Sequence, residues 1–191
     1  VRIRANASKA MRGFSPRGPW LAIGNWSQWP APVSFAAMRP APRRIRPRMQ
    51  FPDYPFAPQR FEVRPGIAMS YLDEGPKDGE VVLMLHGNPS WSFYWRHLVN
   101  GLKDRYRCIV PDHVGMGLSD RPDDAASASP RYDYTLQSRI DDLDALLRHL
   151  GIDGPLTLAV HDWGGMIGFG WALRDPARVR RLVITHTASF P

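Results

Sequence analysis

Residues able to do chemistry gather where predicted strands end, and Asp162 is the candidate nucleophile among them. It stands between an apolar run that ends at Val160 and the two glycines Gly164 and Gly165. A strand that turns this sharply into a helix pushes the apex residue out of the sheet, at the helix N-terminus, where backbone N–H groups favour an ionised carboxylate. Such a carboxylate can attack carbon and form an ester. The simpler alternative is that Asp162 only caps the helix, a common role for Asp.

Two further loops follow predicted strands and complete a candidate site. In His86–Pro89, Gly87 lets the backbone approach a ligand and Asn88 offers an amide donor, which together with the Trp163 backbone N–H would form an oxyanion hole. The alternative is an ordinary Asn-Pro turn. The loop Pro111–Asp120 lacks the Lys of a phosphate-binding loop and the third Gly of a dinucleotide fingerprint, so it is expected to pack beneath the site.

Four histidines also lie at or just past predicted strand ends. None of them belongs to a close ligand pair of the H-x-x-x-H kind that binds zinc. We therefore predict packing roles for these side chains, with neither a metal nor a cofactor in the site; the four are His86, His113, His161 and His186.

Alternating strands and helices must position these loops. The clearest helix covers 135–150, where leucine and isoleucine side chains fall on one face and Gly151 is placed to end it. The alternation predicts an α/β fold with a mostly parallel, doubly wound sheet and a site beyond the carboxyl ends of the strands. Predicted strands cover 59–63, 67–72, 81–85, 107–111, 155–160 and 181–185, and predicted helices cover 92–102, 135–150 and 163–174.

The net positive charge of the chain comes from its first quarter. Residues 1–48 hold ten Lys and Arg and no acidic residue, whereas residues 49–191 carry a net charge of −3. We interpret 1–48 as a disordered Pro/Arg-rich arm and 49–191 as the N-terminal portion of the folded domain. The arm is either upstream translation with Met49 as the true start, which we favour, or a targeting presequence, or a functional tail. It has no nucleic-acid-binding motif, so no nucleic-acid partner is predicted.

Composition indicates one ordinary globular domain. Of the 191 residues, 43% are hydrophobic and 23% are charged. No apolar run approaches the roughly 20 residues that span a bilayer. Cys108 is the only cysteine, which excludes an intrachain disulfide and fits a cytoplasmic protein.

Taken together, the three loops resemble those of the haloalkane dehalogenases within the α/β-hydrolase superfamily. The resemblance covers about residues 57–191 and rests on His86–Pro89, on the PDxxGxGxSD pattern of Pro111–Asp120 and on Val160–Gly164. It implies an α/β-hydrolase fold in which Asp162 attacks the substrate carbon, Asn88 and the indole N–H of Trp163 hold the departing halide, and water completes hydrolysis of the ester.

Finer motifs narrow the resemblance. Epoxide hydrolases typically have Gly where this chain has Val160 and an HGFP-type loop where it has Asn88, which favours the dehalogenase branch. Runs in 86–95, 133–139 and 164–171 are similar to the third dehalogenase subgroup, which includes the β-lactone decarboxylases of long-chain olefin biosynthesis. The implied substrate is therefore small and apolar, either a haloalkane or a β-lactone.

The chain departs from this family at its end. It stops at Pro191, just after the sixth predicted strand, before the helical cap, the last strands and the base histidine that the resemblance implies. One dehalogenase subgroup places its catalytic acid where this chain has His186. A third expectation is therefore an inactive, C-terminally truncated fragment with a raw sheet edge and an unroofed apolar pocket.

Overall fold

The computed structural model describes residues 51–122 and 131–188. They belong to one compact unit that extends from Arg48 to Pro191. The predicted arm 1–48 lies outside the described residues, so its disorder stays a prediction. Among the described residues, no helix is long and apolar enough to cross a membrane.

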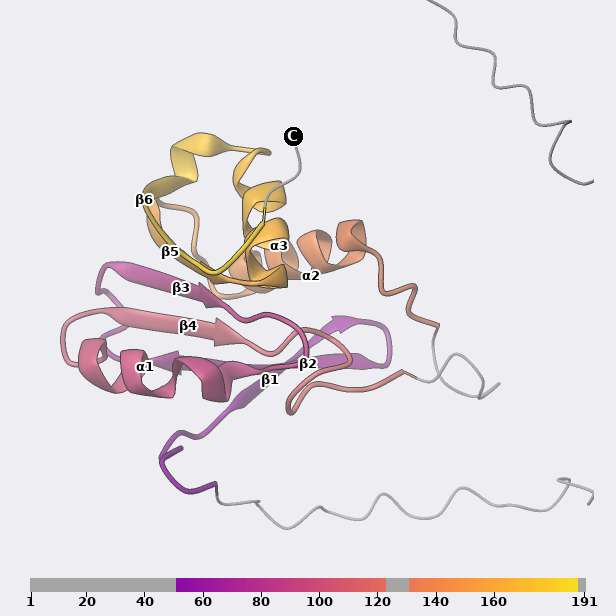
Figure 1. Ribbon diagram of the computed structural model, residues 1–191, viewed down its shortest axis with the longest axis horizontal. Helices are drawn as coiled ribbons and strands as arrows, with labels where there is room; N and C mark the ends of the chain where they lie inside the picture. Colours follow the sequence, from indigo (N-terminus) through magenta and orange to yellow (C-terminus); the bar gives the residue numbers. More distant parts are fainter. Residues whose placement is uncertain (1–50, 123–130, 189–191) are drawn as a thin grey trace, which may run out of the picture. The chain divides into compact units, whose positions relative to one another are not determined.

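A six-stranded sheet in the order β1-β2-β4-β3-β5-β6 forms the centre of the unit (Figure 1). Strands β1 and β2 are antiparallel to each other, β2 is antiparallel to β4, and β3 to β6 run parallel, which confirms the predicted mostly parallel sheet. The strands are β1 (Gln59–Arg64), β2 (Ile67–Glu74), β3 (Val81–Leu85), β4 (Arg107–Pro111), β5 (Leu156–His161) and β6 (Val179–Thr185).

Helices cover both faces of the sheet (Figure 1). Because side chains alternate along a strand, β3 sends Leu83 and Leu85 to one face and Val82 and Met84 to the other. The first pair packs with α2 (Leu136–His149) and α3 (Trp163–Ala172), and the second pair packs with α1 (Arg96–Leu102). The continuous apolar runs read from the sequence are therefore strands buried on both faces.

The predicted helix 92–102 differs in its first turn, which is a 3-10 helix over Ser92–Trp95. In a 3-10 helix, side chains three residues apart eclipse one another, so Ser92 and Trp95 both point inward and are buried. The buried Asp112 carboxylate accepts the Ser92 N–H at 2.7 Å and thereby fixes this turn.

Both ends of α2 are capped, and the predicted stop at Gly151 is confirmed, whereas Thr135 is the N-cap rather than the first helical residue. Thr135 accepts the Ser138 N–H at 3.1 Å at the N-terminus, and Gly151 has φ 65° just past the C-terminus. A short 3-10 helix, Pro176–Arg178, precedes β6, which starts two residues earlier than predicted.

Candidate active site

Asp162 occupies a sharp, strained turn between β5 and α3. Its backbone has φ 49° and ψ −128°, a conformation that costs free energy for any residue with a side chain. The turn brings α3 close to the sheet: a Cβ on Gly164 would overlap the Leu85 carbonyl. The predicted elbow is therefore present, and a glycine two residues after its apex makes the close packing possible.

The Asp162 carboxylate bonds to the loop that follows β3, and the first N–H group of α3, that of Trp163, lies nearby. Asp162 Oδ1 accepts the backbone N–H of Asn88 at 2.7 Å, and the side chain makes no capping bond to α3. The simple capping role is therefore wrong. The nearby backbone N–H of Trp163 and the N–H of Asn88 together hold the pKa of Asp162 below its usual value, so the carboxylate is ionised at neutral pH.

Gly87 and Asn88 bring the β3 loop against this carboxylate. A Cβ on Gly87 would overlap the carboxyl group of Asp162, so only glycine allows the approach. The Asn88 backbone N–H is already bound to Asp162, which leaves the exposed side-chain amide as the group of Asn88 that can reach a ligand.

A buried histidine pair supports the loop from below. His86 Nε2 accepts the backbone N–H of His113 at 3.0 Å, so its Nδ1 carries the proton and donates to the Gly87 carbonyl at 2.8 Å. His113 Nε2 in turn donates to the His86 carbonyl at 3.1 Å. Burial lowers the pKa of His86 to about 4 and lowers that of His113 as well, so both rings are neutral.

The loop after β4 packs beneath the site, as expected. Asp112 is fully buried and accepts the N–H groups of Ser92 and Leu118, and Asp120 accepts the Ala68 N–H at 2.8 Å. Burial raises the pKa of Asp112 despite these bonds. The loop therefore connects β2, β4 and the 3-10 turn into one support for the elbow.

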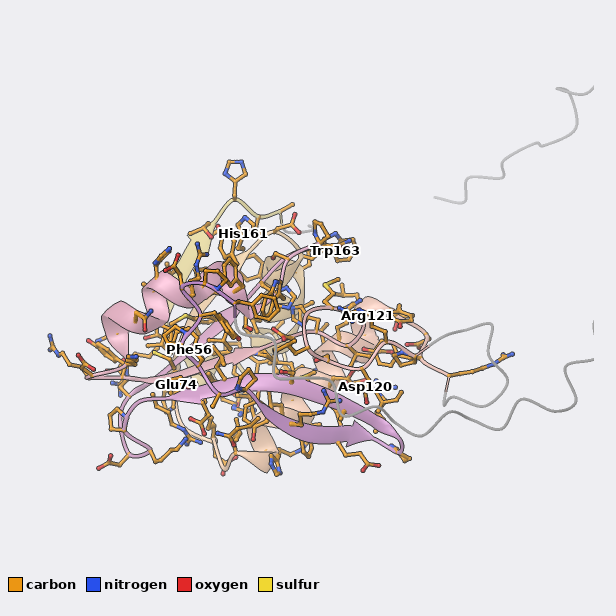
Figure 2. The ribbon with its side chains drawn as sticks, turned by 90° about the horizontal axis from the view of Figure 1, so that it is seen from below. Phe56, Glu74, Asp120, Arg121, His161 and Trp163 are labelled. Atoms are coloured by element: carbon orange, nitrogen blue, oxygen red, sulfur yellow. The ribbon has the colours of Figure 1, made fainter. Side chains whose placement is uncertain are left out.

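An open pocket of about 650 Å³ lies beside the nucleophile candidate. Trp163 is 42% exposed there, and His161, on the other side of Asp162, stacks on Tyr94 with ring centroids 4.2 Å apart. Figure 2 shows His161 and Trp163 near each other and away from Glu74, which lies toward the opposite end of the sheet. The pocket is lined by Asp162, Trp163, Met166, His186, Thr187 and Ala188.

The structure brings Asp162 and Asn88 into contact and places Trp163 directly beside them. It adds Met166 and Thr187, which sequence reasoning missed. Met166 could have been found, because a residue three positions after Trp163 lies on the same face of a helix. Thr187 carries no signal in its spacing. Among the described residues, no group of three or more His, Cys, Asp or Glu side chains could hold a metal ion.

The sequence was compared with known protein families. Residues 80–191, more than half of the chain, match the family described as alpha/beta hydrolase fold. The chain belongs to the α/β-hydrolase family. Its strand order and the sharp turn directly after β5 agree with that fold, and Asp162 is the residue at the turn.

Among curated proteins, this α/β hydrolase is 78% identical over 143 residues to a cis-3-alkyl-4-alkyloxetan-2-one decarboxylase of Xanthomonas campestris, over 75% of this chain and 48% of the relative. It is 57% identical to the decarboxylase of the same name from Shewanella oneidensis, over 69% of this chain and 39% of the relative. A haloalkane dehalogenase of Mycolicibacterium paratuberculosis is 39% identical, over 70% of this chain and 44% of the relative. The chain thus spans less than half the length of these relatives.

Solved structures give the same picture. A structure described as a novel epoxide hydrolase from hot-environment metagenomes matches with a TM-score of 0.61 and 38% identity, covering 70% of this chain and 43% of that one. A loop variant of a haloalkane dehalogenase from Bradyrhizobium elkanii matches with a TM-score of 0.59 and 35% identity, covering 66% of this chain and 39% of that one. The backbone alone therefore does not separate these chemistries.

Proposed function

We propose that this α/β hydrolase decarboxylates a β-lactone, with Asp162 as its nucleophile and an alkene as product. The observation that carries the proposal is the ionised Asp162 carboxylate, held at a strained elbow and open to the pocket. The 78% identity to a cis-3-alkyl-4-alkyloxetan-2-one decarboxylase supports the proposed substrate class. An oxetan-2-one is a four-membered β-lactone, whose ring strain favours opening.

The chemistry balances without water or a redox partner. Asp162 attacks C4 of the lactone, the C4–O1 bond breaks, and an ester to Asp162 and a free substrate carboxylate result. The bond from C3 to the carboxylate then breaks and releases CO₂. Its electron pair forms the C3=C4 double bond, and the C4–O bond to Asp162 breaks to regenerate the aspartate.

Asn88 and Trp163 suit the charge that develops in the first step. The exposed amide of Asn88 and the indole N–H of Trp163 are neutral donors. They can therefore bind the departing lactone oxygen without competing with Asp162 for a proton. The low pKa of Asp162 keeps the attacking group ionised while these donors stabilise the leaving group.

Haloalkane dehalogenation is the second candidate, favoured by the 39% identity to a dehalogenase. Asp162 would displace the halide onto the same donors, and water would then hydrolyse the ester. That second step needs a base to activate water. The lactone route has no such requirement.

The test uses the protein expressed from its complete reading frame, with the 191-residue chain in parallel. Alkene and CO₂ release from a cis-3,4-dialkyl β-lactone is measured beside bromide release from a 1-bromoalkane. Asp162→Asn should lower the active reaction by at least about 1,000-fold, because it removes the attacking oxygen charge. Asp153→Asn, an exposed residue remote from the pocket, is the matched control.

The outcomes distinguish the decarboxylase, dehalogenase and inactive-fragment hypotheses. Alkene release without bromide release supports the decarboxylase, and the reverse result supports the dehalogenase. Full activity of Asp162→Asn in either reaction would refute the nucleophile. Activity of the complete protein with none in the 191-residue chain would support the inactive-fragment reading for the chain itself.

A further inference from the structure

We propose that Thr187 is a positioning residue for the nucleophile, an inference that rests on the proposed role of Asp162. The Thr187 hydroxyl donates to the Asp162 carbonyl at 2.6 Å. The Gly165 N–H donates to the same carbonyl at 2.9 Å, and the Asp162 N–H donates to the His186 carbonyl at 3.1 Å. The segment that follows β6 thus holds the backbone of Asp162 at both its N–H and its carbonyl.

The backbone of Asp162 needs such support because its conformation is strained. With φ 49° and ψ −128°, it would relax toward a commoner conformation if the surrounding contacts allowed it. Rotation about either angle would turn the carboxylate away from the Asn88 N–H, which now binds Oδ1 at 2.7 Å. The Thr187 bond therefore acts on the direction of the attacking oxygen, although Thr187 lies 25 residues away along the chain.

The hydroxyl of Thr187 is committed to this contact. It has one proton, and its other acceptor in reach, the Ala188 carbonyl, lies at 3.3 Å, so the shorter bond to Asp162 is favoured. Gly165 makes room for the contact, because a Cβ at that position would overlap the Thr187 hydroxyl oxygen. The side chain of Thr187 and the missing side chain of Gly165 therefore form a matched pair.

Loss of the Thr187 bond should lower the rate of attack and leave substrate binding unchanged. In-line displacement needs the carboxylate oxygen aimed at the substrate carbon, and small errors of position cost large factors in rate. A loosened elbow would misdirect the carboxylate in many encounters. The pocket walls that hold an apolar substrate, such as Met166 and the Trp163 ring, would stay in place.

Thr187→Val tests this in the complete protein, because valine keeps the shape of threonine and removes only the hydroxyl. We expect kcat and the single-turnover rate of ester formation to fall about 10- to 100-fold, with KM within about twofold. Thr187→Ser retains the hydroxyl and should recover most of the loss. Thr185→Val is the matched control, since Thr185 donates to the Val160 carbonyl at 2.9 Å and does not bond to Asp162.

Gly165→Ala completes the experiment. It should displace the Thr187 hydroxyl, so that adding Thr187→Val to it lowers the rate little further. Unchanged kcat in Thr187→Val, a rise in KM alone, or no recovery by serine would overturn the inference. Asp162→Asn in the same series separates the two proposals: if it stays active the nucleophile is wrong, and if it is inactive while Thr187→Val is fully active only the positioning role fails.

Discussion

At the scale of single residues, the site depends on a carboxylate that stays charged and two histidines that stay neutral. The backbone N–H groups of Trp163 and Asn88 lower the pKa of Asp162, whereas burial lowers the pKa values of His86 and His113. The neutral ring of His86 accepts one N–H and donates to the Gly87 carbonyl, next to Asn88. Protonation of His86 would remove its acceptor and disturb the loop that contacts Asp162.

The first prediction concerns acid stability. His86 has a folded pKa of about 4 against an ordinary value of 6.5, so the unfolded chain takes up a proton first as the pH falls. The contribution of neutral His86 to the free energy of unfolding is therefore complete above pH 6.5. It is lost progressively toward pH 4, at about 1.4 kcal/mol per pH unit. Urea unfolding from pH 7.5 to 4.5 measures this slope. His86→Gln should make it shallower, and the exposed His97→Gln should not; equal slopes in all three proteins would contradict the assignment.

The second prediction concerns the donors beside Asp162. Trp163→Phe keeps the exposed ring and removes its N–H, and Asn88→Ala removes the side-chain amide while keeping the backbone N–H bound to Asp162. Each change should lower kcat/KM about 10- to 1,000-fold by removing a donor to the leaving group. Single-turnover kinetics of ester formation provides the check, because a donor to the leaving group acts in that step. A rise in KM alone, with ester formation at the wild-type rate, would show another role.

At the scale of elements, the sequence was sufficient where local patterns decide the structure. The runs Val81–Leu85 and Arg107–Pro111 are strands with the predicted bounds, because continuous apolar residues suit strands covered on both faces. Contacts between distant residues had no local signature. The 3-10 turn Ser92–Trp95 depends on Asp112, the His86 ring is fixed by the backbone of His113, and Thr187 reaches back to Asp162. The elbow could be predicted, but its supports could not.

The third prediction concerns how α2 is attached to β1. The buried Asp142 carboxylate accepts Arg64 Nε at 2.7 Å and the Tyr132 hydroxyl at 2.6 Å. Asp142→Asn removes the charge that pairs with the half-buried Arg64, so the free energy of unfolding should fall by about 2 kcal/mol. Asp141→Asn on the same helix, whose partner Arg174 is also exposed, should cost less than about 0.5 kcal/mol. Urea unfolding measures both, and equal losses would contradict the difference in burial.

At the scale of the whole chain, β6 is the edge strand of the sheet within residues 51–122 and 131–188, and it has exposed apolar side chains on both faces. Leu182, Val183 and Ile184 are 46%, 44% and 56% exposed, and only β5 pairs with this strand among the described residues. An exposed apolar edge favours pairing with another chain. The 191-residue chain should therefore self-associate and bind a hydrophobic dye.

The fourth prediction uses this edge. Ile184→Lys should reduce self-association of the 191-residue chain, because a charge on an edge strand opposes strand pairing. Leu173→Lys is the control: Leu173 is 80% exposed but lies just past α3, away from the strand edge. Sedimentation velocity at several concentrations measures the effect. A larger reduction by Leu173→Lys would show that general apolar exposure, rather than the edge, drives association.

The central claim is that Asp162 forms an ester with the substrate carbon. The most direct measurement mixes the complete protein with excess β-lactone or bromoalkane, quenches within one turnover, digests the protein and maps the adduct by mass spectrometry. We expect a mass increase equal to the opened lactone or the alkyl group on the peptide that contains Asp162, and no increase in Asp162→Asn. An adduct on another residue, or turnover of Asp162→Asn at the wild-type rate, would contradict it.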